Sequence, residues 1–152
     1  MISVQRLAMV VGVAGLIPFI AGALGLLLTP AHAHWIISWF HIYSAGILAF
    51  MAGIYWPVAI QLENRCYPLS PVVTLVISQA LFLTGGLALL LPQGWRAVIY
   101  PATYIALCLI DVRWLYNYWP RWYRRLRIGL TTVVVLCQLA VMGWLFLHPW
   151  QG

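Results

Sequence analysis

Five apolar stretches dominate this chain, and each is long enough to cross the hydrocarbon core of a membrane. An α-helix rises about 1.5 Å per residue, so about twenty residues span roughly 30 Å of hydrocarbon. The stretches cover residues 7–28, 37–62, 72–91, 97–114 and 128–147, with prolines between them. We therefore expect an all-α polytopic membrane protein, in which residues 1–152 form a single domain of five transmembrane helices.

The composition excludes a soluble domain. Hydrophobic residues make up 64% of the 152 residues and charged residues only 7%, whereas about a quarter of the residues in soluble domains are charged. A soluble domain of this size would leave too much of that apolar surface in contact with water.

The distribution of charge predicts the orientation in the membrane. The net charge of +6 comes from eight arginines set against two acids, Glu63 and Asp111. If the N-terminus is cytoplasmic, only Arg96 lies on the outer side. The inner side then holds Arg6, Arg65, Arg113, Arg121, Arg124, Arg125 and Arg127. Because short cytoplasmic loops are enriched in arginine, we expect a cytoplasmic N-terminus and a periplasmic C-terminus.

The segment DVRWLYNYWPRWYRRLR, residues 111–127, carries five arginines and six aromatic residues. Such a composition can bind single-stranded nucleic acid, where arginines meet phosphates and rings stack on bases. Here the segment joins two apolar stretches, so aromatic rings at headgroup level and arginines facing lipid phosphates explain it better. We expect a lipid anchor and no nucleic-acid partner, with Arg121, Trp122, Tyr123 and Arg125 as anchoring residues.

Small residues and prolines indicate how the helices pack. Ala45, Ala49 and Gly53 recur every four residues in the second stretch, and small residues allow membrane helices to approach closely, which predicts a compact bundle. Pro18 and Pro57 lie inside the first two stretches and predict kinks, because proline lacks an amide donor. A kink can open a ligand cavity or serve only the geometry of the bundle.

Asp111 is the strongest single candidate for a functional residue. It lies at the inner end of the fourth stretch, where an ionisable group is costly and is by default a functional hypothesis. The alternative is a structural ion pair with a nearby arginine, for which Arg113, Arg124 and Arg127 are candidates. Both interpretations stay open.

The histidines are weak candidates for metal ligands. His34, His41 and His148 fall near the outer side, and imidazole suits copper or haem iron, but no carboxylate or cysteine accompanies them. No catalytic motif or pair of carboxylates is present either. We predict no enzyme activity, no metal site and no cofactor, with haem, copper or quinone as open alternatives.

Several segments resemble a known family. GLIPF (15–19), FMAGIYW (50–56), LCLID (107–111) and above all WYRRLRIGLTTVVVL (122–136) are similar to a small family of membrane proteins of unknown function, with bacterial members and vertebrate transmembrane protein 69. The resemblance implies a multi-pass protein of the bacterial inner membrane, or of the mitochondrial inner membrane in eukaryotes. A histidine usually precedes the tryptophan of the second span in that family, whereas here Tyr55 precedes Trp56.

These features favour one function and leave a second as the alternative. The first is a non-catalytic subunit, assembly factor or stabiliser of a larger membrane complex, whose partners are lipids and other integral membrane subunits. The second is a binder or carrier of a quinone, lipid or metal, in a cavity near Pro18, Trp56 and Asp111, with Tyr55 available for hydrogen bonding.

Overall fold

A computed structural model describes residues 3–62 and 69–149, and these residues contain helices and no strand. The helices are α1 (Val4–Ala14), α2 (Ile17–Leu28), the 3-10 helix η1 (Pro30–His32), α3 (Ala33–Gly53), α4 (Tyr55–Leu62), α5 (Pro71–Ala88), α6 (Gln93–Arg113) and α7 (Arg121–Leu147). Consecutive helices combine into five units long and apolar enough to cross a membrane within the described residues. The predicted all-α fold with five spans is confirmed.

The first span is interrupted where proline removes a backbone donor. α1 ends at Ala14 and α2 begins at Ile17, so the break lies directly before Pro18. The hydroxyl of Tyr43, on α3, donates a hydrogen bond of 2.9 Å to the carbonyl oxygen of Gly15 within the break. The second span is interrupted at Ile54, between α3 and α4, three residues before Pro57. Both breaks lie where the prolines predicted kinks.

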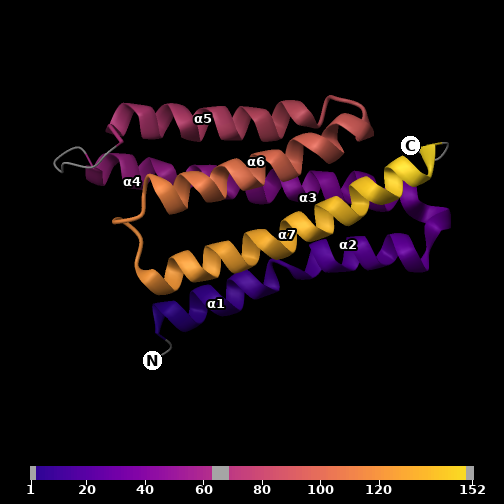
Figure 1. Ribbon diagram of the computed structural model, residues 1–152, viewed down its shortest axis with the longest axis horizontal. Coiled ribbons are helices and arrows are strands. Elements are labelled where there is room, and N and C mark those ends of the chain that lie inside the picture. The colour runs from indigo at the N-terminus through magenta and orange to yellow at the C-terminus, as the bar shows by residue number, and fades with distance from the viewer. Residues whose placement is uncertain (1–2, 63–68, 150–152) are drawn as a thin grey trace.

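The spans form a closed ring around a shared core. α2 packs against α3, α3 against α5, α5 against α6, α6 against α7, and α7 against α2. α3 and α6 also touch across the ring, and α1 packs on α7. Figure 1 shows α5 and the α1–α2 span along opposite edges of the molecule, with α7 beside the α1–α2 span. No residue of α1 is buried, so the first span encloses the core mainly through Phe19 and Leu26 of α2.

The two ends of the bundle differ in charge. The N-terminus lies at the same end as the connection between α6 and α7, and the C-terminus lies at the opposite end (Figure 1). That first end carries Arg6 and the arginines of residues 113–127, whereas Arg96 lies near the start of α6, at the other end. Glu63 and Arg65 lie outside the described residues. Which end faces the cytoplasm stays a prediction.

The predicted helix boundaries differ from the structure by three residues or more at five places. The first span begins at Val4 instead of residue 7, and the long helix of the second begins at Ala33 instead of 37. The last helix begins at Arg121 instead of residue 128, the fourth begins at Gln93 instead of 97, and the third ends at Ala88 instead of 91. Hydropathy placed the start of the last span after the arginines, because charged residues lower the mean hydropathy. Arginine is a good helix former, however, and Pro120 directly precedes the first turn, so the helix begins at Arg121. The anchoring residues Arg121, Trp122, Tyr123 and Arg125 therefore belong to α7 and not to a loop.

Candidate functional site

A buried ion pair joins three helices at the arginine-rich end of the bundle. Asp111, in the last turn of α6, is 1% exposed, and Arg127, in the second turn of α7, is 5% exposed. The Nε of Arg127 donates a hydrogen bond of 2.7 Å to Oδ2 of Asp111, and its Nη2 forms a salt bridge with the same oxygen. The Tyr55 hydroxyl, from α4, donates to Oδ1 at 2.8 Å. Both carboxylate oxygens are thus bonded, as a buried charge requires.

The other residues predicted as ligand or ion-pair candidates do not contact Asp111. Arg113 is exposed on α6, because residues two positions apart on a helix point in different directions. The side chain of Trp56 is 49% exposed on the surface of the helix bundle, although its neighbour Tyr55 is fully buried. Arg124 stacks on the ring of Tyr116, with 3.5 Å between its Cζ and the ring centroid. The structure therefore brings Asp111, Arg127 and Tyr55 together and separates them from Arg113, Arg124 and Trp56.

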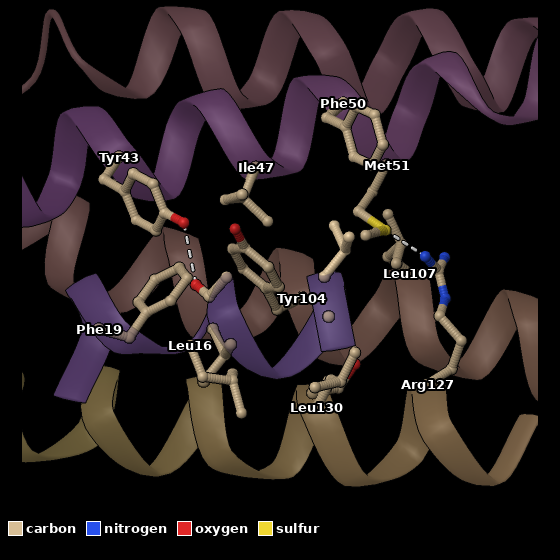
Figure 2. A pocket seen from close by; sticks show the side chains of 15 residues that line it. Leu16, Phe19, Tyr43, Ile47, Phe50, Met51, Tyr104, Leu107, Arg127 and Leu130 are labelled. Carbon is tan, nitrogen blue, oxygen red and sulfur yellow. Dashed lines mark hydrogen bonds between the residues drawn. The ribbon is translucent and has the colours of Figure 1, made fainter. Parts of the chain in front are cut away.

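A cavity of about 440 Å³ extends from Arg127 into the bundle (Figure 2). Its walls come from five helices and are almost entirely apolar. The lining residues are Val11, Gly12, Gly15, Leu16, Phe19, Tyr43, Ile47, Phe50, Met51, Tyr104, Leu107, Arg127, Leu130, Thr131 and Val134. Figure 2 shows Arg127 and Met51 at one end, Tyr43 and Phe19 at the other, and Tyr104 between them.

The cavity is partly open to the surface of the bundle, and exposed residues of α1 and α3 contribute to its wall. Val11 of α1 and Phe50 of α3 both line it, and their side chains are 61% and 65% exposed. In a membrane this surface faces lipid, so the geometry offers a lateral route from the hydrocarbon phase to the cavity. The break before Pro18 places Gly15 and Leu16 in its wall. The break before Pro18 is therefore part of the cavity wall.

Few polar groups in the cavity are free to bind a ligand. The hydroxyl of Tyr104 donates to the carbonyl oxygen of Ser44 at 2.8 Å, and the hydroxyl of Tyr43 donates to Gly15. Arg127 is held by Asp111, contacts the sulfur of Met51 and interacts with Tyr123, whose ring centroid lies 5.8 Å from the Cζ of Arg127. A guanidinium carries five N–H donors, so Arg127 retains capacity for an acceptor atom inside the cavity. The chemistry offered is an apolar chamber with one cationic hydrogen-bond donor at its end.

The three candidate histidines lie in different surroundings. His34 is exposed, and its Nδ1 lies 3.3 Å from Nε2 of Gln93. His41 is buried and stacks on Tyr100, and the ring of His148 stacks on Trp144. In residues 3–62 and 69–149, no group of three or more histidine, cysteine, aspartate or glutamate side chains is arranged to hold a metal ion. Each of the three histidines thus contacts a different polar or aromatic neighbour.

One buried polar residue escaped the sequence analysis. Gln138, in the middle of α7, is 2% exposed, and within the described chain neither its amide nitrogen nor its amide oxygen has a hydrogen-bond partner. A polar amide inside an apolar span is the same signal that identified Asp111. That signal was present in the sequence and would have found it.

The anchoring segment forms a second polar region at the same end. Trp122 and Tyr123 are half-buried on α7, whereas Arg121 and Arg125 are exposed. Tyr116 lies in the connection between α6 and α7, and its hydrogen bond and charge interaction with Arg124 lower the pKa of its phenol. This region is separate from the cavity, because none of these six residues lines the cavity.

Comparison with known proteins identifies relatives but no activity. Residues 4–143 match the family described as "Protein of unknown function (DUF3429)". The chain is 25% identical over 146 residues to Transmembrane protein 69 of Mus musculus. The alignment covers 95% of this chain and 59% of the mouse protein. It thus spans about three fifths of that relative's length. No solved structure matches.

Proposed function

The chain belongs to the DUF3429 family of proteins of unknown function, and we propose that this multi-pass membrane protein binds one amphiphilic small molecule from the lipid phase. The observation that carries the proposal is the cavity of about 440 Å³ that ends at a buried arginine. Quinones and single-chain lipids are the classes that fit, because both combine an apolar body with oxygen acceptors. The role is one of binding or carrying, without catalysis.

The size and lining of the cavity support this proposal. Small-molecule sites generally enclose about 300–1,000 Å³ and combine mostly apolar walls with a few polar groups that fix orientation. Arg127 supplies such a group. Asp111 binds the guanidinium, and the Tyr55 hydroxyl in turn donates to Asp111. An oxygen acceptor of the ligand would bind the guanidinium, and the apolar body would lie against Leu16 and Leu107.

The proposal includes the place and orientation of the protein. We place it in the bacterial inner membrane, with the arginine-rich end of the bundle in the cytoplasm, in agreement with the positive-inside rule. In that orientation Arg127 lies toward the cytoplasmic leaflet, and the open side of the cavity faces its acyl chains.

A second candidate function is a subunit or assembly factor of a larger membrane complex. The outward face of α3 favours it, because Gly46 and Gly53 have no atom within 4 Å of the position where a Cβ would lie. Such glycines allow the backbone of another helix to approach closely. The face is exposed, whereas Ala45, in the same helix, is buried within the bundle.

Purification from native membranes in a mild detergent separates the two functions. We expect a partner-free protein that carries about one equivalent of a small amphiphile, detected by mass spectrometry of the organic extract and, for a quinone, by absorption. Stoichiometric co-purifying membrane subunits, together with an empty cavity, would support the complex and contradict the ligand-binding function.

A further inference from the structure

A second hollow lies at the arginine-rich end, apart from the cavity. It encloses about 340 Å³ and is lined by Val112, Tyr116, Arg121, Arg124, Arg125 and Ile128. Three of these side chains are cationic, and none is acidic. The hollow lies between the end of α6 and the start of α7, so both helices and the connection between them contribute to it.

The arginines of this hollow have no counter-charge within the described chain. Asp111 is the one carboxylate in residues 3–62 and 69–149, and it is bound to Arg127. Arg121, Arg124 and Arg125 form no ion pair in those residues. Three neighbouring cations without a carboxylate repel one another, and an anion among them would relieve that repulsion.

Arg124 is held in place and still has a free donor. Its Cζ lies 3.5 Å from the centroid of the Tyr116 ring, an arrangement that orients the guanidinium by cation–π attraction. Its Nη1 is buried and has no hydrogen-bond partner among the described residues. Buried donors in proteins are almost always bonded, so an orphan donor on a side chain that lines the hollow indicates a missing acceptor nearby.

We propose that this hollow binds the phosphate group of one anionic phospholipid. Arginine matches phosphate oxygens with paired N–H donors, and basic pockets beside membrane helices bind lipid headgroups in this way. Ile128, 45% exposed on the next turn of α7, continues the hollow as an apolar wall along which an acyl chain can lie. The combination selects a phosphate attached to a lipid over a free phosphate. The site is independent of the ligand in the cavity.

Native mass spectrometry of the purified full chain tests this site. The protein is titrated with dioleoyl phosphatidylglycerol, with dioleoyl phosphatidylcholine as the zwitterionic control, and separately with inorganic phosphate. Arg124→Gln removes the oriented donor, and Arg125→Gln removes an exposed charge from the same hollow with little effect on packing. Arg113→Gln is the matched control, because Arg113 lies at the same end of the bundle but does not line the hollow.

We expect one phosphatidylglycerol to bind more tightly than phosphatidylcholine. Each arginine contributes roughly fivefold in affinity, so Arg124→Gln and Arg125→Gln each weaken binding by about that factor and Arg113→Gln leaves it unchanged. An equal loss in all three variants would mean diffuse attraction to the charged end and would overturn the site. So would equal binding of the two lipids, or inorganic phosphate that binds as tightly as phosphatidylglycerol.

Discussion

At the scale of single residues, the ion pair between Asp111 and Arg127 holds α4, α6 and α7 together. Both side chains are almost completely buried, and the carboxylate also accepts a hydrogen bond from Tyr55. Removal of one charge from such a pair leaves the other without compensation in a medium of low dielectric constant. The pair therefore positions Arg127 at the polar end of the cavity. Loss of either charge should destabilise the fold.

Asp111→Asn is expected to destabilise the protein by about 3–5 kcal/mol, because Arg127 then stays buried without its counter-charge. Unfolding of the purified protein in mixed micelles, followed by circular dichroism, measures the change. The double variant Asp111→Leu with Arg127→Met removes both charges and should recover most of the stability. Full stability of the single variant would show that the pair contributes nothing to the fold.

A substitution at Gln138 should stabilise the protein instead of destabilising it. Its amide is buried and has no partner in the described chain, and an unsatisfied buried polar group costs about 1–3 kcal/mol. Gln138→Leu, which keeps the length of the side chain nearly unchanged, should raise the thermal unfolding midpoint in detergent. A lower midpoint would mean that the amide is bonded in the purified protein, to a lipid or another chain.

At the scale of helices, close packing depends on particular glycines. A Cβ at Gly22 of α2 would lie 2.7 Å from Cδ2 of Phe40. Phe40 is buried and packs edge-on against Phe19, with 5.5 Å between the ring centroids, so it has little room to move. The contact between α2 and α3 thus requires glycine at this position.

Gly22→Ala should cost about 1–3 kcal/mol through overpacking. Gly46→Ala is the matched control on the outward face of α3, where an added Cβ meets no atom within 4 Å, and it should be neutral or stabilising by up to about 1 kcal/mol. The unfolding free energies of both variants in one detergent give the comparison. Equal effects would contradict the packing of α2 on α3.

More of the helical architecture than of the candidate site could be predicted from the sequence. Hydropathy and proline are local signals, so the five spans and the breaks near Pro18 and Pro57 followed from them. The start of α7 could not be predicted in this way, because hydropathy does not distinguish a charged loop from a charged helical turn. The partner of Asp111 lies sixteen residues away, on another helix, and only packing selects Arg127 over Arg113. The cavity has no local signature, because five helices line it.

At the scale of the whole molecule, orientation follows from where the arginines gather. We expect alkaline phosphatase fused to the C-terminus to be active in the periplasm, and a green fluorescent protein fused there to stay dark, because the arginine-rich end holds the N-terminus in the cytoplasm. The same fusions made after Leu62 should give the reverse result. Fluorescence from the C-terminal fusion would contradict the orientation.

One pair of variants on α3 tests whether the cavity holds a bound amphiphile. Ile47→Trp fills the cavity from α3, whereas Ile42→Trp adds the same ring to the same helix at a side chain that is 47% exposed and does not line the cavity. The measurement is the amount of bound amphiphile per protein, by mass spectrometry after identical purification. We expect about one equivalent in the native protein and in Ile42→Trp, and little in Ile47→Trp. Equal amounts in all three proteins, or none in the native protein, would contradict ligand binding in the cavity.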